Sequence, residues 1–271
     1  MPFYLPWIFV AILYSPILYQ LYSSRWDTID YTHAYFILPV SLWLIWRKRK
    51  EFKILPQSGG SLKALAFLII GLAMFTLGWR KDFLFVSTMS LIPVAFGLIS
   101  YQYGFKAAGT VRFPILYLLL MVPPPLGILD AITLPMRYET STMAYLILKS
   151  FFLSVTKDGL LLSVEGQQVY MGPACSGFRS LITMISLGLL YAYLTKGSFK
   201  KKMVLLACIV PLALLGNLIR VLILCLLAYY FGNEVAQGFL HYFSGFVVFI
   251  ITLLGLIWIE SFLHSRDSEY E

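Results

Sequence analysis

Charged side chains are scarce in this sequence. Asp, Glu, Lys and Arg make up 13% of its 271 residues, whereas apolar residue types make up 59%. A soluble domain of this size carries about twice that charged share. Because long apolar runs recur from one end of the chain to the other, the composition excludes an ordinary soluble domain and indicates a lipid environment.

Cysteine and histidine are also rare, with three residues of each type. An odd and low cysteine count argues against a disulfide framework. Cys208 and Cys225 lie within apolar runs and are expected to be small packing residues. The three scattered histidines lack the spacing of metal ligands, so neither a metal nor another cofactor is expected.

The apolar runs predict an all-α polytopic membrane protein with eight transmembrane helices. The runs have lengths compatible with the ~20 residues that cross a bilayer, except that the second and fifth are short. The first run is too long and too aromatic for a cleaved signal peptide and is taken as a span. The eight runs cover about residues 3–22, 34–46, 62–79, 83–102, 113–128, 174–194, 203–230 and 241–260.

The net charge of +8 indicates orientation rather than a nucleic-acid partner. Most Lys and Arg residues lie in short segments between apolar runs, as is typical of cytoplasmic loops. With the N-terminus inside, 13 of them fall in inside segments and 6 in outside segments, while Arg179 and Arg220 lie within spans. This bias predicts that both termini are cytoplasmic. The outside residues are Arg25, Arg80, Lys81, Arg137, Lys149 and Lys157.

Residues 123–173 form the longest stretch between spans and are expected to build a small cap on the outer surface. The stretch opens with three prolines, which cannot continue a regular helix. Residues 160–164 and 168–171 are predicted to pair as a β-hairpin across Glu165-Gly166. Residues 1–271 are otherwise expected to form a single domain. An amphipathic helix is predicted over residues 130–153, with an apolar face at Ile132, Met136, Met143, Ile147 and Phe151.

The run from Gly172 to Ser180 contains a candidate nucleophile where the cap meets the sixth span. Pro173 suits a helix start, which would place Cys175 in the first turn, where the helix dipole favours an anion. Arg179 follows at i+4, and both effects would lower the pKa of the thiol. Gly177 would let a substrate backbone approach closely. A buried packing cysteine at a helix end remains an open alternative.

Two further residues are expected at the same face of the membrane. Arg220 lies ~26 Å along the seventh span from Met203, and His241 begins the eighth span. Each also has a simpler interpretation, namely an interfacial or ion-paired arginine and a solvated histidine at a helix end. Together with Cys175, however, they would supply a nucleophile, a proton carrier and an oxyanion ligand for acyl transfer.

This pattern resembles the exosortase/archaeosortase family of membrane transpeptidases. The nucleophile motif of that family, Cys-Ser-Gly-x-Arg-Ser, is matched by Cys175, Ser176, Gly177, Arg179 and Ser180. Its Asn-x-x-Arg motif is matched by Asn217 and Arg220, and its late histidine by His241, as in the bacterial branch. The family also has a histidine at the start of an early span, followed by a proline within the span and basic residues at its end. His33 is similar to that histidine, although Ala34 stands where family members often have glycine.

The resemblance implies a function in protein sorting at the bacterial inner membrane. Such enzymes act on secreted proteins whose C-terminal signal has a short motif, Pro-Glu-Pro in the best-known branch, a hydrophobic helix and a basic tail. Cys175 would attack the scissile carbonyl, His241 would move protons and Arg220 would bind the oxyanion. Arg179 would tune Cys175 or contact the signal. The acceptor, whether lipid, glycan or water, remains open.

Two alternatives from other functional classes remain at this point. A transporter or channel would explain eight spans and an intramembrane arginine, but it would not explain the motif around Cys175. A membrane scaffold without catalysis would predict that Cys175→Ser has no effect.

Overall fold

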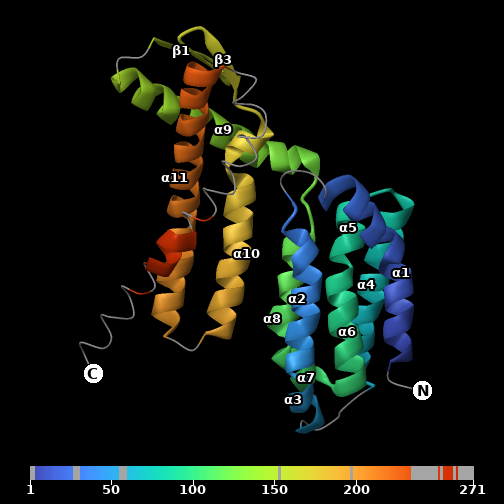
Figure 1. Ribbon diagram of the computed structural model, residues 1–271. Coiled ribbons are helices and arrows are strands. Elements are labelled where there is room, and N and C mark those ends of the chain that lie inside the picture. Colours follow the sequence, from blue (N-terminus) through green and yellow to red (C-terminus); the bar gives the residue numbers. More distant parts are fainter. Residues whose placement is uncertain are drawn as a thin grey trace, which may run out of the picture. The chain divides into compact units, whose positions relative to one another are not determined.

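The computed structural model describes residues 4–26, 31–54, 60–151, 154–195 and 198–232, together with residues 250, 253–258 and 261. The described chain is mostly helical and includes one small sheet (Figure 1). It divides into two compact units, residues 1–125 and 126–271.

The first unit is entirely helical in its described part. Its longest helices lie side by side, and shorter helices and turns connect them (Figure 1). In chain order the elements are α1 (Leu5–Leu21), the π-helical turn η1 (Tyr22–Trp26), α2 (Ala34–Arg47), α3 (Arg49–Ile54), α4 (Leu62–Arg80), α5 (Leu84–Met89), α6 (Leu91–Tyr103), α7 (Phe105–Thr110), α8 (Arg112–Tyr117) and the 3₁₀ turn η2 (Leu118–Met121).

Glycines let α4 and α6 approach closely. A Cβ atom on Gly71 would lie 2.9 Å from the backbone nitrogen of Val94, and one on Gly97 would lie 2.8 Å from the backbone nitrogen of Leu68. Apolar burial gives little driving force between helices in lipid, so close packing through small residues is the usual substitute. The core of this unit therefore depends on backbone proximity.

The end of η2 leaves carbonyl groups that the helix itself cannot satisfy. The carbonyls of Leu120 and Met121 would normally accept from the N–H groups four residues later, but those positions are prolines. Side chains from the segment before α2 replace them. His33 Nε2 donates to the Leu120 carbonyl at 3.2 Å, and Trp26 Nε1 donates to the Met121 carbonyl at 3.1 Å.

Four described helices are long and apolar enough to cross a membrane. They match the first, third, fourth and seventh expected spans: Leu5–Trp26, Leu62–Arg80, Leu84–Tyr103 and Phe199–Phe231. The second, fifth and sixth correspond to shorter apolar helices, Ala34–Arg47, Arg112–Met121 and Phe178–Leu194. Most of the eighth expected span lies outside the described residues, so the number eight stays a prediction.

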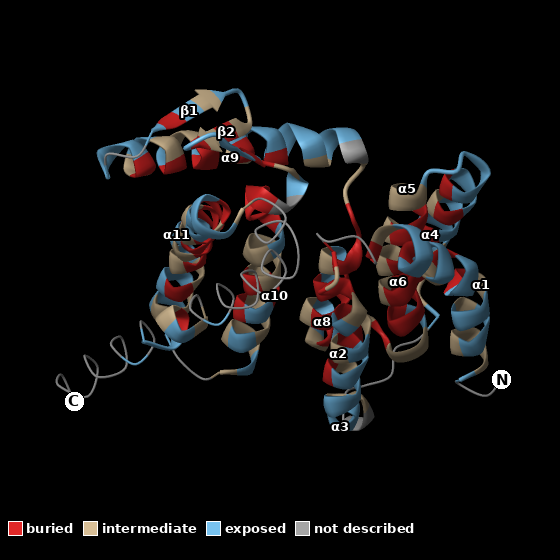
Figure 2. Cartoon of the chain, turned by 45° about the horizontal axis from the view of Figure 1, so that its top comes forward, coloured by how far each residue is buried: buried red, intermediate tan, exposed pale blue. Residues whose placement is uncertain are grey.

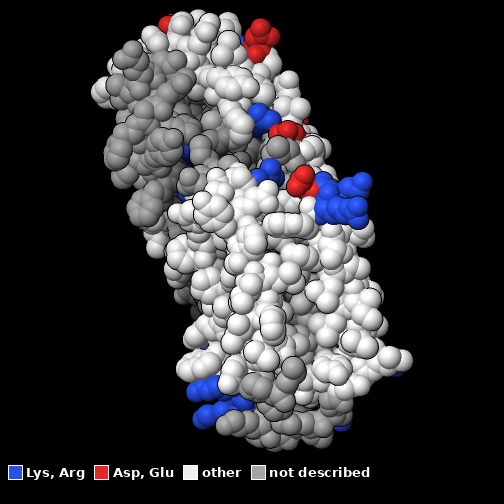
Figure 3. Space-filling view, turned by 90° about the vertical axis from the view of Figure 1, so that its right-hand side faces the viewer, with Lys and Arg blue, Asp and Glu red and all other residues white. Residues whose placement is uncertain are grey.

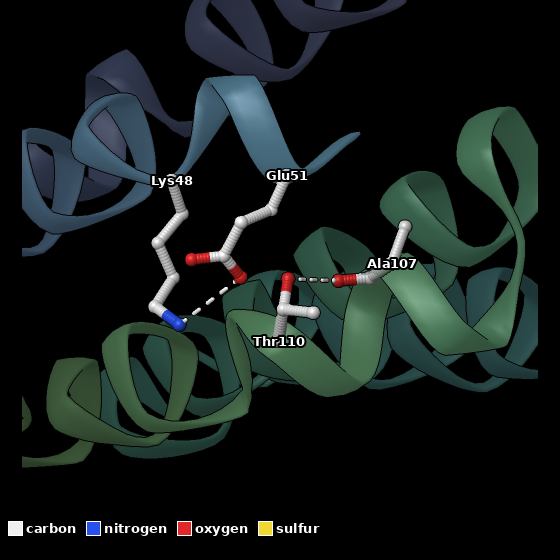
Figure 4. Close-up of polar contacts among 4 residues, drawn as sticks. All are labelled: Lys48, Glu51, Ala107 and Thr110. Carbon is white, nitrogen blue, oxygen red and sulfur yellow. Dashed lines mark hydrogen bonds and ion pairs between the residues drawn. The ribbon is translucent and has the colours of Figure 1, made fainter. Parts of the chain in front are cut away.

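The charge distribution of the first unit is that of a membrane protein. In the lower part of the face in Figure 3, a broad area without charged side chains lies between Lys and Arg side chains below and a mixed group of basic and acidic side chains above. At the end of α2, the Arg49 guanidinium lies 3.8 Å from the centre of the exposed Trp46 ring, a pairing typical of membrane interfaces. Figure 4 shows the Lys48–Glu51 ion pair of 3.3 Å beside α7, where the Thr110 hydroxyl donates to the Ala107 carbonyl.

The second unit places a helix and a sheet at one end of two apolar helices (Figure 1). The strands form an antiparallel sheet in the order β1-β2-β3. The expected hairpin is confirmed, with Val164 opposite Gln167 and both turn residues at positive φ. A third strand adds to it. The elements are α9 (Leu126–Ser150), β1 (Val155–Asp158), β2 (Leu161–Val164), β3 (Gln167–Tyr170), the 3₁₀ turn η3 (Pro173–Ser176), α10 (Phe178–Leu194) and α11 (Phe199–Phe231).

The buried face of α9 differs from the apolar face that its sequence predicts. Ile132 and Met143 are exposed, as is Phe151 just beyond the helix. Most of the residues that pack inward are small or polar, and Figure 2 shows buried residues along the helix in red. The predicted face is thus correct only in part, because Met136 and Ile147 are partly buried while the other three residues are exposed. The buried residues are Thr133, Arg137, Thr140, Ser141, Ala144 and Leu148.

Candidate active site

Cys175 lies in the 3₁₀ turn η3, which precedes the long helix α10. Its backbone N–H donates to the Gly172 carbonyl at 2.9 Å. Gly177 then adopts a left-handed conformation, with φ of 75°, and α10 begins only at Phe178. The Ser176 hydroxyl accepts a hydrogen bond from the Phe178 N–H at 3.2 Å. A helical turn does begin at Pro173 and contains Cys175, as expected, but it is a separate 3₁₀ turn that ends at Ser176, so Cys175 does not lie in the first turn of α10.

Gly177 allows α11 to approach this turn. A Cβ atom at this position would lie 2.7 Å from Cγ of Asn217 and 2.8 Å from its Cβ. The positive φ also disfavours any residue with a side chain. The space beside Gly177 is thus filled by Asn217, where the sequence had predicted a substrate backbone.

Asn217 connects the nucleophile turn to two helices. Its Nδ2 donates to the Cys175 carbonyl at 2.8 Å and lies 3.5 Å from Oγ1 of Thr140 on α9. All three residues are buried. Because buried hydrogen bonds restrict geometry, this arrangement fixes the backbone of Cys175 against both α9 and α11.

Burial raises the pKa of the Cys175 thiol above its usual value. The positive charge of Arg220, the backbone hydrogen bond to Gly172 and the positive charge of Arg137 act in the opposite direction but do not cancel the burial. Arg179 was expected on the same face as Cys175, yet it is exposed. The expectation that Arg179 and a helix start together lower this pKa is therefore corrected, and the cations acting on the thiol are Arg220 and Arg137.

The structure brings together one part of the expected site. The turn η3 packs on α11, and this contact brings together Cys175, Ser176, Gly177, Asn217 and Arg220. His33 belongs to the first unit and bonds to the Leu120 carbonyl. His241 lies outside the described residues.

Sequence reasoning missed the contribution of α9. Arg137 was counted as an outside loop charge, but it is buried and its charge acts on Cys175. Thr140 was not singled out, although it reaches Asn217. The signal was present in the helical spacing of Thr133, Arg137, Thr140 and Ser141, which gives one polar stripe within an amphipathic helix.

Comparison with known proteins identifies the family. The family model described as Transmembrane exosortase (Exosortase_EpsH) matches residues 26–258, which is most of the chain and includes every residue of the candidate site. No curated protein and no solved structure matches the chain. The motif resemblance around Cys175 and Arg220 and the family match agree, and the chain belongs to the transmembrane exosortase family.

Proposed function

We propose that this exosortase is a cysteine transpeptidase that cleaves the C-terminal sorting signal of secreted proteins. The family implies a membrane-embedded role in processing sorting signals, generally with cysteine peptidase chemistry. The observation that carries the proposal is the position of Cys175. Its backbone is fixed by Asn217, and its buried thiol lies within the electrostatic influence of Arg220.

The reaction proceeds in two acyl-transfer steps. The Cys175 sulfur attacks the scissile carbonyl carbon, and the carbonyl oxygen becomes an oxyanion that the Arg220 guanidinium binds. The carbon–nitrogen bond then breaks, a thioester forms, and the leaving amine takes a proton from His241. An acceptor, a lipid, a glycan or water, attacks the thioester and gives its proton to His241. His241 returns this proton to the sulfur as the carbon–sulfur bond breaks, and the thiol of Cys175 is released.

The raised pKa of Cys175 means that the reaction requires a base to remove the thiol proton. Because burial favours the protonated thiol, the nucleophile has to lose its proton during the reaction. His241 is the histidine that the family motif supplies for this role. Arg220 then compensates the charge of the thiolate before it binds the oxyanion.

The proposed location follows from the loop charges and the substrate. Both termini lie in the cytoplasm, and the protein crosses the bacterial inner membrane several times, with Cys175 toward the outside. The partners are the bilayer and the hydrophobic helix of the sorting signal. A secreted protein presents its signal motif outside the membrane, which is the side that the charge bias assigns to Cys175.

Replacement of the nucleophile tests this function. A candidate substrate with a C-terminal sorting signal is produced in cells together with the wild-type protein, Cys175→Ala or Cys208→Ala, and its C-terminus is identified by mass spectrometry. We expect truncation with wild type and with Cys208→Ala, because Cys208 lies elsewhere on α11 and takes no part in the site. Cys175→Ala should leave the substrate intact while inserting to the same level.

The same experiment separates the alternatives. A transporter, a channel or a scaffold predicts that the C-terminus of the substrate does not depend on Cys175. Continued processing by an inserted Cys175→Ala protein would therefore reject the transpeptidase proposal.

A further inference from the structure

A stripe of buried polar residues crosses α9 beside the candidate site. Arg137 is 8% exposed and Ser141 is fully buried, one helical turn apart. Within the part of the chain that the structure describes, neither Nε of Arg137 nor Oγ of Ser141 has a hydrogen-bond partner. Burial of a guanidinium N–H and a hydroxyl without partners is costly, so packing alone does not account for the stripe.

The stripe faces the nucleophile turn. Helix α9 packs against η3, and Thr140 lies 3.5 Å from the Asn217 amide that holds the Cys175 carbonyl. Arg137 precedes Thr140 by three residues and therefore lies on the same face of the helix. Further along this face, Ala144 and Leu148 share an apolar cluster with Cys175.

We propose that Arg137 is a positioning residue of this site, whose guanidinium stabilises the Cys175 thiolate together with that of Arg220. The inference rests on the proposed function, in which Cys175 is the nucleophile. When a base removes the thiol proton, the negative charge stays on sulfur in a buried place. A guanidinium keeps its positive charge in proteins. Two such groups on different helices therefore offset the cost of burying the negative charge on sulfur.

Few other described groups can influence the charge on this sulfur. On α9 the remaining charged residues, Asp130, Glu139 and Lys149, are exposed. On α10 Arg179 is exposed as well. On α11 the neighbours of Cys175 are Arg220 and Cys225, and Cys225 is fully buried in the same apolar cluster.

The rate of thiol alkylation against pH tests the proposal. Full-length protein carrying Cys208→Ala and Cys225→Ala is purified in detergent and treated with iodoacetamide, a small uncharged reagent, over about pH 6 to 11. Arg137→Gln should raise the midpoint by about one pH unit, so that alkylation below the midpoint slows about tenfold. The plateau at high pH, which reports access to the thiol, should not change.

Three control variants separate charge from packing. Arg137→Lys keeps the positive charge and should retain most of the parent midpoint. Arg179→Gln removes an exposed charge, and Ser141→Ala removes a neutral group from the same stripe, so both should leave the midpoint where it is. Midpoints that coincide for the parent and Arg137→Gln would overturn the proposal.

A second pair of variants applies the test without replacing Arg137. Ser141→Asp introduces a carboxylate one turn from the guanidinium and should neutralise its effect on the sulfur, which raises the midpoint. Ser141→Asn has a similar shape without charge and should not. Equal midpoints for this pair would also overturn the proposal, even where Arg137→Gln fails to insert.

Alkylation needs no sorting signal, so it separates this inference from the proposed function. A midpoint raised by Arg137→Gln in a protein that processes no substrate would refute the transpeptidase function and leave the electrostatic role. An unchanged midpoint in a protein that processes its substrate normally would refute only the role of Arg137.

Discussion

At the scale of single residues, Gly177 combines two requirements. Its backbone has a left-handed conformation, and its missing side chain leaves room for Asn217. Gly166, in the turn between β2 and β3, shares the first requirement only, since its φ is 84° and no atom lies within 4 Å of where a Cβ would be. The two glycines therefore form a natural pair for separating backbone strain from close packing.

Gly177→Ala should disable the site, whereas Gly166→Ala should not. We expect Gly166→Ala to cost about 1–2 kcal/mol of backbone strain while processing continues. Gly177→Ala should cost about 2–4 kcal/mol because the new methyl group displaces Asn217, and processing should be lost. Thermal unfolding in detergent and substrate processing measure the two effects. Equal losses of stability and full activity in both variants would contradict the role given to the Gly177–Asn217 contact.

The raised pKa of Cys175 also predicts a pH dependence. Only the thiolate attacks, and burial keeps the thiol protonated, so the reactive fraction is small near neutral pH. We expect the rate of alkylation of Cys175 by iodoacetamide to rise with pH, by up to about tenfold per pH unit, until the pH passes the pKa of the thiol. Arg220→Gln removes a charge that lowers this pKa, so the rise should move to higher pH.

The exposed Arg179 supplies the control for this measurement. Arg179→Gln should leave the position of the rise unchanged, because Arg179 is not among the charges that act on Cys175. An alkylation rate that stays constant from neutral pH upward would show that the thiol is already ionised in the folded protein.

At the scale of elements, the proline run after η2 determines which side chains must donate hydrogen bonds to the carbonyls at the end of that turn. Prolines at 123–125 remove the N–H donors that helical carbonyls would use, and His33 and Trp26 supply donors instead. This gives His33 a structural task, whereas the family resemblance had suggested a supporting role in the site. The two interpretations differ in what they require of the side chain, because a carbonyl needs only a donor.

Replacement of His33 distinguishes these tasks. His33→Gln keeps a donor and should preserve both stability and processing. His33→Ala leaves the Leu120 carbonyl without this donor and should lower stability by about 1 kcal/mol or more. Thermal unfolding and processing are the measurements. Loss of processing in a His33→Gln protein of normal stability would instead favour a role for the imidazole in the reaction.

Local patterns predicted some of these elements and missed others. Glu165-Gly166 between short apolar runs was enough to predict the hairpin of β2 and β3. Strand β1 was missed because Val155–Asp158 lacks the apolar alternation that marks a strand. The motif residues Cys175, Asn217 and Arg220 could be found from the sequence because each lies in a recognisable pattern. Arg137 joins them only through the packing of α9, which depends on which helix face is buried.

At the scale of the whole molecule, orientation links the membrane spans to the chemistry. The bias of Lys and Arg between loops predicts the side of each segment, and the sorting signal requires Cys175 on the outer side. Only an exposed position can report the orientation, because a cysteine introduced there must react with a labelling reagent. Gln167 on β3 and Ser198 before α11 are both exposed. Lys157 is less suitable, because it is partly buried and its Nζ bonds to Thr142.

Cysteine labelling tests the orientation of both ends of the second unit. In a background of Cys175→Ser, Cys208→Ala and Cys225→Ala, a membrane-impermeant thiol reagent should label Gln167→Cys in intact spheroplasts. Ser198→Cys should react only after the membrane is permeabilised, because it adjoins the basic segment assigned to the cytoplasm. Native Cys175 is only 3% exposed and should resist the bulky reagent on either side. If Ser198→Cys reacts in intact spheroplasts and Gln167→Cys does not, the site faces the cytoplasm. It could not then reach the motif of a secreted protein, and the proposed function would fail with the orientation.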